Sequence, residues 1–312
     1  MLTWYDALFY IAFVGQIFLI SHYFPSLIAH RMRHVLETYP PSEYPKLYPK
    51  SPEYYRLGGW AYEKANRIIM YIGIAVLFAV IFLVDHSTFA DDGFISEFWP
   101  AAYGLLQFMP GMLLELSEFS QLKLMRKANA STVRTANLQP RRLFDYLPPL
   151  LVTAVIGAIA LSILFDLYIN DFRIGGESDV LVRAAVTIGT NLFMGAFAAW
   201  ILYSRNPNPH QTSADRSKQI SASLRSFAYV SIALSVYMMV GAADDVFAID
   251  YLDAALMSIY FQVIVFLSLG HLLRCLTVDS LNFDVYKEGN SSTDARGAQN
   301  DGRTGIAIQH EQ

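Results

Sequence analysis

The sequence predicts an all-α, polytopic membrane protein: a bundle of seven transmembrane helices, with the amino terminus outside and the carboxyl terminus in the cytoplasm. Three observations lead to this fold class. Of the 312 residues, 54% are hydrophobic and 16% are charged, whereas a soluble domain has about 25% charged residues. Apolar stretches close to the ~20 residues that cross a bilayer recur seven times. The basic residues gather in alternate connections between those stretches.

The seven apolar stretches are separated by connections that carry most of the charged residues. They lie at 8–29, 68–84, 101–116, 150–168, 184–203, 227–246 and 254–276. The second and third are the shortest, so we expect them to extend into Arg67 and Ser120. We assign 1–283 to a single membrane domain that includes the cytoplasmic loop 30–67. The remaining segment, 284–312, is small and polar with almost no aromatic residues, which predicts a disordered cytoplasmic tail.

The basic residues set the predicted orientation. All of the 23 lysines and arginines except Arg173 and Arg183 fall on one side of the predicted bundle, and the opposite connections are rich in Asp and Glu. Basic loops remain in the cytoplasm. Seven spans therefore place the amino terminus outside, and we expect the chain in the cell membrane, specifically a bacterial inner membrane, with the lipid bilayer as its first partner.

The third span carries a stripe of polar residues. As a helix it places five residues on one face: Tyr103, Gln107, Gly111, Glu115 and Glu118. An unpaired carboxylate in hydrocarbon costs several kcal/mol, so this face should turn toward other helices or a water-filled cavity. Pro110 predicts a bend that frees backbone carbonyls in the middle of the span.

This polar face supplies the candidate binding site. Gln107, Glu115 and Glu118 are predicted to bind a small solute or a cation, since two nearby carboxylates can hold a cation or relay a proton. The single amides of spans one, five and seven are further candidates: Gln16, Asn191 and Gln262. A structural interpretation stands beside this one, because buried amides commonly form hydrogen bonds between membrane helices and both glutamates can pair with neighbouring groups.

Two rows of small residues predict places where helices pack closely. One lies on span five and the other on span four: Thr187, Asn191, Gly195 and Ala199, and Ala154, Ala158 and Ser162.

The loop 30–67 is rich in tyrosine and proline. Its prolines, at 40, 41, 45, 49 and 52, exclude a helix there and favour extended turns, while Trp60 to Arg67 is predicted to be a short helical lead into span two. We interpret the loop as a stiff linker whose tyrosines lie at the headgroups. The alternative is a docking segment for a cytoplasmic protein partner.

Several absences narrow the function. The chain contains no zinc-protease motif, nucleophile elbow, phosphate-binding loop or dinucleotide fingerprint. The single cysteine, Cys275, excludes a disulfide framework, and span seven has no lysine for a retinal Schiff base. We therefore expect no catalytic residues, metal, cofactor or nucleic-acid partner. Transport or sensing of a small solute is the first hypothesis, and a non-catalytic scaffold that docks partners through its cytoplasmic loops is the second.

Overall fold

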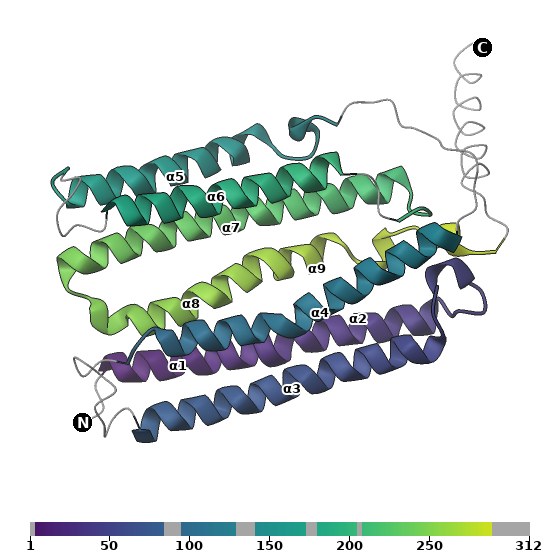
Figure 1. The fold of residues 1–312 in the computed structure, drawn as a ribbon, viewed down its shortest axis with the longest axis horizontal. Coiled ribbons are helices and arrows are strands. Elements are labelled where there is room, and N and C mark those ends of the chain that lie inside the picture. Colours follow the sequence, from purple (N-terminus) through teal and green to yellow (C-terminus); the bar gives the residue numbers. More distant parts are fainter. Residues whose placement is uncertain (1–3, 84–94, 129–140, 173–179, 205–207, 289–312) are drawn as a thin grey trace, which may run out of the picture.

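The computed structural model describes residues 4–83, 95–128, 141–172, 180–204 and 208–288. Within these ranges the chain is helical and has no strand. The longest elements form seven rods (Figure 1): α1 (Trp4–Phe18) continuing through the π-helical turn η1 (Leu19–Tyr23) into α2 (Phe24–Thr38); α3 (Pro52–Leu83); α4 (Phe98–Ala128); α5 (Pro149–Ile169); α6 (Val180–Tyr203); α7 (Ser213–Phe247); and α8 (Asp253–Val265) continuing through the π-helical turn η6 (Phe266–Gly270) into α9 (His271–Cys275). Short 3₁₀ turns lie between the rods: η2 (Pro45–Leu47), η4 (Leu143–Asp145), η5 (Asp250–Leu252), η7 (Val278–Ser280) and η8 (Asp284–Tyr286).

Six of the rods are long and apolar enough to cross a membrane: Trp4–Thr38, Pro52–Phe82, Pro149–Ile169, Val180–Tyr203, Ser213–Asp244 and Asp250–Cys275. The chain thus has the character of a multi-pass membrane protein with an all-helical fold. The predicted third span lies in α4, which is not among the six. Its polar residues lower its mean hydropathy. A seventh span, and the orientation, remain predictions.

The rods pack as two groups. The large group consists of α1–α2, α3, α4 and α8–α9, and the small group consists of α5, α6 and α7. Helix α7 joins them by packing along α8, η6 and α9, and in Figure 1 the small group lies above the large one. The core of the large group is built around Phe9, Phe13 and Tyr103, and that of the small group around Leu202, Ile220 and Leu224.

The tyrosine- and proline-rich loop is shorter than predicted. Helix α3 begins at Pro52, so the expectation that helix starts near Trp60 was wrong. Proline is favourable at the first helical position, where its missing N–H would have no partner anyway. Together with the extension of α2 to Thr38, this leaves 39–51 as the connection, and η2 makes one helical turn even there.

The connection 39–51 packs against the segment that follows α9. The rings of Tyr39 and Phe283 stack with centroids 4.1 Å apart, and the Tyr48 hydroxyl donates to the Tyr39 carbonyl at 2.7 Å. Burial raises the pKa of Tyr48 to about 12. The segment includes η8, with Tyr286 buried, so the structure continues into the first residues of the predicted tail. The rest of that tail, 289–312, lies outside the described residues.

Candidate functional site

The amides of Gln16 and Gln107 meet in the interior of the large group. Gln16, from α1, donates from Nε2 to Gln107 Oε1 at 3.0 Å and to the Pro100 carbonyl at 3.2 Å. Gln107, from α4, donates from Nε2 to Ser21 Oγ at 2.8 Å and to the Gln16 carbonyl at 3.2 Å. Both side chains are buried. Gln16 and Gln107, two of the predicted site residues, are thus brought together. The side chain of each donates hydrogen bonds to the rod that carries the other.

Tyr103 extends this network to a third rod. Its hydroxyl lies 3.0 Å from Ser21 Oγ, in the π-helical turn η1, and donates to the Ile69 carbonyl of α3 at 3.1 Å. The close approach requires glycine at position 73, because a Cβ there would lie 2.2 Å from the Tyr103 oxygen. One group of the network, Gln16 Oε1, is buried without a hydrogen-bond partner. We call these linked side chains, Gln16, Ser21, Tyr103 and Gln107, the amide network.

The other two predicted amides also bond to neighbouring helices. Gln262, on α8, donates to the Ala12 carbonyl of α1 at 2.9 Å, and Gly15 leaves room for it, since a Cβ at that glycine would lie 2.9 Å from the Gln262 oxygen. Asn191, on α6, accepts a hydrogen bond from the Ser231 hydroxyl of α7 and donates to its own helix at the Thr187 carbonyl, 2.8 Å away. All four amides therefore make bonds between helices.

The two predicted glutamates lie apart from the amide network. Glu115 and Glu118 are exposed and line a cavity of about 400 Å³ between α4 and α6. The predicted polar face is thus divided between two environments. Figure 1 shows the reason: α4 crosses the bundle obliquely, so its first half packs beside α1 while its second half leaves it. A helical wheel places residues around one axis and carries no information about which neighbour each turn meets.

The rest of the cavity wall comes from both helices. Helix α4 adds Phe119, Leu122 and Arg126, and α6 adds Trp200 and Ser204. Residue pattern alone did not single out Trp200. A tryptophan near the cytoplasmic end of a span is typical of the aromatic belt at the membrane interface, so the sequence signal at Trp200 is the same whether the ring faces lipid or a cavity.

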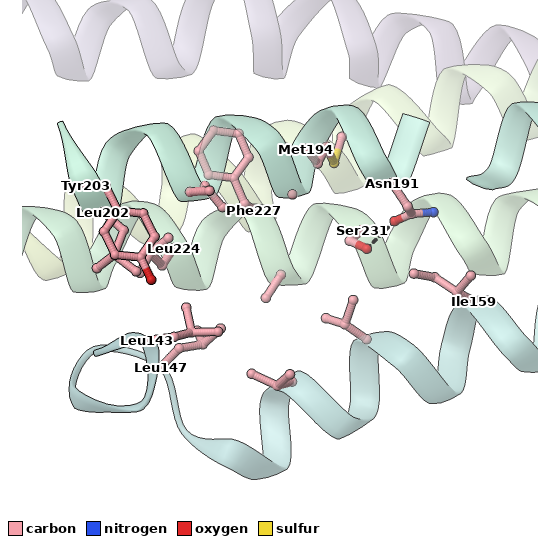
Figure 2. Close-up of a pocket in the computed structure, with 16 residues that line it drawn as sticks. Leu143, Leu147, Ile159, Asn191, Met194, Leu202, Tyr203, Leu224, Phe227 and Ser231 are labelled. Carbon is pink, nitrogen blue, oxygen red and sulfur yellow. Dashed lines mark hydrogen bonds between the residues drawn. The ribbon is translucent and has the colours of Figure 1, made fainter. Parts of the chain in front are cut away.

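A second cavity, of about 310 Å³, lies among α5, α6 and α7. Figure 2 shows Asn191 and Ser231 at one end of it and Leu143, Leu147, Leu202 and Tyr203 at the other. The prediction of close packing along α6 was wrong for its inner half: Gly195 and Ala199 line this groove and are exposed. A Cβ at Gly195 would have no atom within 4 Å. The outer half of this row on α6 is packed: Thr187 is buried there, and so is Ser162 of α5.

An ion pair joins α5 to α6 toward the end of the bundle that is predicted to lie outside. Arg183 Nη2 is 2.9 Å from Asp166 Oδ1, and its Nε donates to both carboxylate oxygens at 3.2 Å. Both side chains are largely buried. The sequence analysis placed Arg183 on the outer side but gave it no partner, because nothing in the connection between the two spans specifies how α5 and α6 align.

Within the described ranges, no group of three or more His, Cys, Asp or Glu side chains could hold a metal ion. Comparison of the chain with protein-family models, with curated protein sequences and with solved structures found no match.

Proposed function

We propose that this chain is a seven-span membrane protein that binds a small organic cation in the cavity between α4 and α6, as a step in its transport or sensing. The observation that carries the proposal is the composition of that cavity: two carboxylates on α4, Glu115 and Glu118, face the same space as the indole of Trp200 on α6. Its volume of about 400 Å³ lies in the range of small-molecule sites.

The charges in the cavity favour a monovalent cation. Two carboxylates and the guanidinium of Arg126 leave one net negative charge. An aromatic face attracts a cation through its quadrupole, and tryptophan does so best. Phe119 also lines the cavity, but the ammonium of Lys123 already lies over its ring at 4.5 Å from the centroid, so Trp200 is the ring that we assign to the ligand. Carboxylates at the wall and rings beside them suit a quaternary or primary ammonium group better than a fully hydrated metal ion.

The proposal requires that α4 also crosses the membrane, as the third of seven spans in chain order. Its 31 residues extend about 46 Å at 1.5 Å per residue, which exceeds the ~30 Å of hydrocarbon. The buried polar groups of its first half, Tyr103 and Gln107, have hydrogen-bond partners in the protein, as a helix in lipid requires. The cavity supplies an aqueous or ligand-filled environment for Glu115 and Glu118.

The scaffold hypothesis is supported by one observation, that all four predicted amides bond between helices and so have a structural role. Its proposed docking segment is less favourable. Tyr39 and Tyr48, in the connection 39–51, use a ring face and a hydroxyl on contacts within the chain, which leaves less of the loop for a partner.

The test uses the purified full-length protein with tetraethylammonium as the probe and sodium as the ionic-strength control. A ligand that binds only the folded protein stabilises it in proportion to the logarithm of its concentration, by about 2.7 kcal/mol at 100 times Kd. We expect thermal stability to rise with tetraethylammonium and not with sodium. Glu115→Gln and Trp200→Leu should each abolish the rise.

Matched variants control for general effects. Glu53→Gln and Trp60→Leu replace an exposed glutamate and an exposed tryptophan on α3, outside the cavity, and should retain the full response to tetraethylammonium. The proposal is rejected if the wild type shows no response to the cation, or if Trp60→Leu and Trp200→Leu lose it equally.

A further inference from the structure

The groove among α5, α6 and α7 has the dimensions of one lipid chain in one leaflet. Along α6 it extends from Asn191 to Tyr203, twelve residues or about 18 Å. Half of the hydrocarbon core of a bilayer is about 15 Å thick. If α6 crosses the membrane as predicted, the groove begins near its cytoplasmic end and ends close to the middle of the bilayer; Figure 2 shows the two ends, at Tyr203 and at Asn191.

The wall of the groove is apolar over nearly its whole length. Leu147, Val155 and Phe227 are typical of the lining. At the deep end, the Ser231 hydroxyl donates to Asn191, and at the shallow end the lining includes Tyr203. Because Gly195 and Ala199 have no bulk, the wall from α6 is recessed there. Such a channel accepts a methylene chain without exposing an unpaired polar group to it.

Two arginines lie at the shallow end. Arg141 donates from Nη1 to the carbonyls of Leu202 and Ser204, both at 3.0 Å. Arg216 donates from Nη2 to the Ile201 carbonyl at 3.4 Å and to Ser204 Oγ at 3.3 Å, and from Nη1 to Gln219 Oε1 at 3.5 Å. Both guanidinium groups therefore sit at the last turn of α6, beside Leu202, which lines the groove.

These arginines carry charge and donors that the chain leaves unused. Neither forms an ion pair with an acidic residue in the part of the chain that the structure describes. The Nε of Arg216 is buried and has no hydrogen-bond partner, which is costly for a charged donor. A cation beside the carbonyls at the end of α6 is favourable in itself. One cation is enough for this, and the bonds to the carbonyls use only some of the N–H groups of each guanidinium.

We propose that the groove binds an acyl chain of an anionic phospholipid from the cytoplasmic leaflet, with Arg141 and Arg216 holding the phosphate of its headgroup. Arginine binds phosphate oxygens through two parallel N–H groups. The Nη2 of Arg141 makes no hydrogen bond among the described residues and can donate to the phosphate, and Arg216 adds a second positive charge beside it. The length of the groove selects a chain, and the paired cations select a negative headgroup. This site is separate from the cation cavity beside Glu115.

The experiment compares lipids that share their acyl chains. The full-length protein is purified in detergent, and binding of palmitoyl-oleoyl phosphatidylglycerol is measured by native mass spectrometry beside palmitoyl-oleoyl phosphatidylcholine and inorganic phosphate. Two arginines near a membrane surface should favour the anionic lipid by about thirtyfold. Inorganic phosphate should not compete at equal concentration, because it lacks the chain.

Two glycine variants test the groove itself. Gly195→Leu places a side chain in the groove and should reduce binding of both lipids at least tenfold. Gly189→Leu makes the same change on the same helix, at an exposed site that also has no atom within 4 Å of a Cβ but lies outside the groove, and should bind lipid as the wild type does. The replacement Arg141→Gln/Arg216→Gln should remove the preference for the anionic headgroup while weak binding of phosphatidylcholine persists.

The proposal is overturned if phosphatidylglycerol and phosphatidylcholine bind equally, because the arginines then do not distinguish the anionic headgroup from the zwitterionic one. It is also overturned if Gly195→Leu keeps full binding, or if inorganic phosphate displaces the lipid at equal concentration. The last result would identify a free-anion site instead of a lipid site.

Discussion

The helices of the two groups are held together by different kinds of contact. In the large group, the amide network ties α1, α3 and α4 together through buried side chains. In the small group, the polar contacts of the described residues lie at three levels: the Asp166–Arg183 pair, the Asn191–Ser231 hydrogen bond, and the hydrogen bonds of Arg216 and Ser221 near the predicted cytoplasmic end. Between the second and third levels the lining is apolar. Hydrogen bonds fix the distance between helices where they occur. Between the Asn191–Ser231 bond and the bonds of Arg216 to the last turn of α6, the small group is open as a groove.

The largest effect should come from breaking the ion pair of the small group. Asp166→Ala leaves the guanidinium of Arg183 largely buried without its carboxylate, which typically costs about 3 kcal/mol or more. Chemical unfolding of the detergent-purified protein measures the loss. Glu63→Ala breaks the exposed pair between Arg33 and Glu63, 3.2 Å apart, and should cost about 0.5 kcal/mol or less. Equal losses from the two variants would contradict the assigned burial.

The next effect is steric and belongs to the large group. Gly73→Ala puts a methyl group 2.2 Å from the Tyr103 hydroxyl and 2.9 Å from Ile17, so the network must shift, and we expect a loss of about 1–3 kcal/mol. Gly157→Ala on α5 is the matched change in the small group. With no atom within 4 Å of its Cβ, it should be neutral or gain up to about 1 kcal/mol from helix propensity. Thermal unfolding of both variants separates the two cases, and a stable Gly73→Ala protein would refute the close approach.

The same contrast shows what could be read from the sequence. The membrane character and the all-helical fold follow from runs of apolar residues, since each run reports its own length and hydropathy. The amides of Gln16 and Gln107 stood out as polar residues in apolar runs. Their partnership did not, because it depends on which helices are neighbours. The division of the α4 face, with Gln107 inward and Glu115 toward α6, depends on the oblique path of the helix, and no residue pattern encodes that path.

The groove was missed for a related reason. Gly195 and Ala199 follow Thr187 and Asn191 at helical spacing, and small residues in such a row are typical of close packing. The row is permissive: it allows a neighbouring helix to approach but does not supply one. Arg141 and Arg216 were counted only as part of the cytoplasmic charge, because their position beside the end of α6 is set by the tertiary fold.

A smaller effect should follow from weakening the amide network without a clash. Gln107→Leu removes the bond between Gln16 and Gln107, yet Gln16 keeps the Pro100 carbonyl and Ser21 keeps Tyr103. Hydrogen bonds between membrane helices contribute about 0.6 kcal/mol on average and up to about 1.7. We expect a loss near 1 kcal/mol. A double-mutant cycle with Gln16→Leu should give a positive coupling energy, and additive losses would show that the two amides act independently.

The smallest effect concerns the contact between the two groups at the end predicted to be cytoplasmic. His210 lies in the connection between α6 and α7, and its ring meets Tyr286, of the segment after α9, edge to face with centroids 6.0 Å apart. Burial lowers the pKa of His210 below its ordinary 6.5, and the nearby charge of Lys46 lowers it further. Since the folded pKa is below the unfolded one, the unfolded chain binds the proton more readily. The stability contributed by neutral His210 is therefore complete above pH 6.5 and is lost as the pH falls through the folded pKa.

The variant His210→Phe keeps an aromatic ring against Tyr286 and removes the titration. We expect the free energy of unfolding of the wild type to decline below pH 6.5 more steeply than that of His210→Phe, and the two slopes to agree above it. Denaturant unfolding in detergent at several pH values gives both curves. Replacing Lys46 with glutamine removes the nearby cation, so the folded pKa of His210 should rise toward 6.5 and the loss of stability below pH 6.5 should become smaller. A wild-type curve parallel to that of His210→Phe throughout would show that the histidine is not buried by the contact between the two groups.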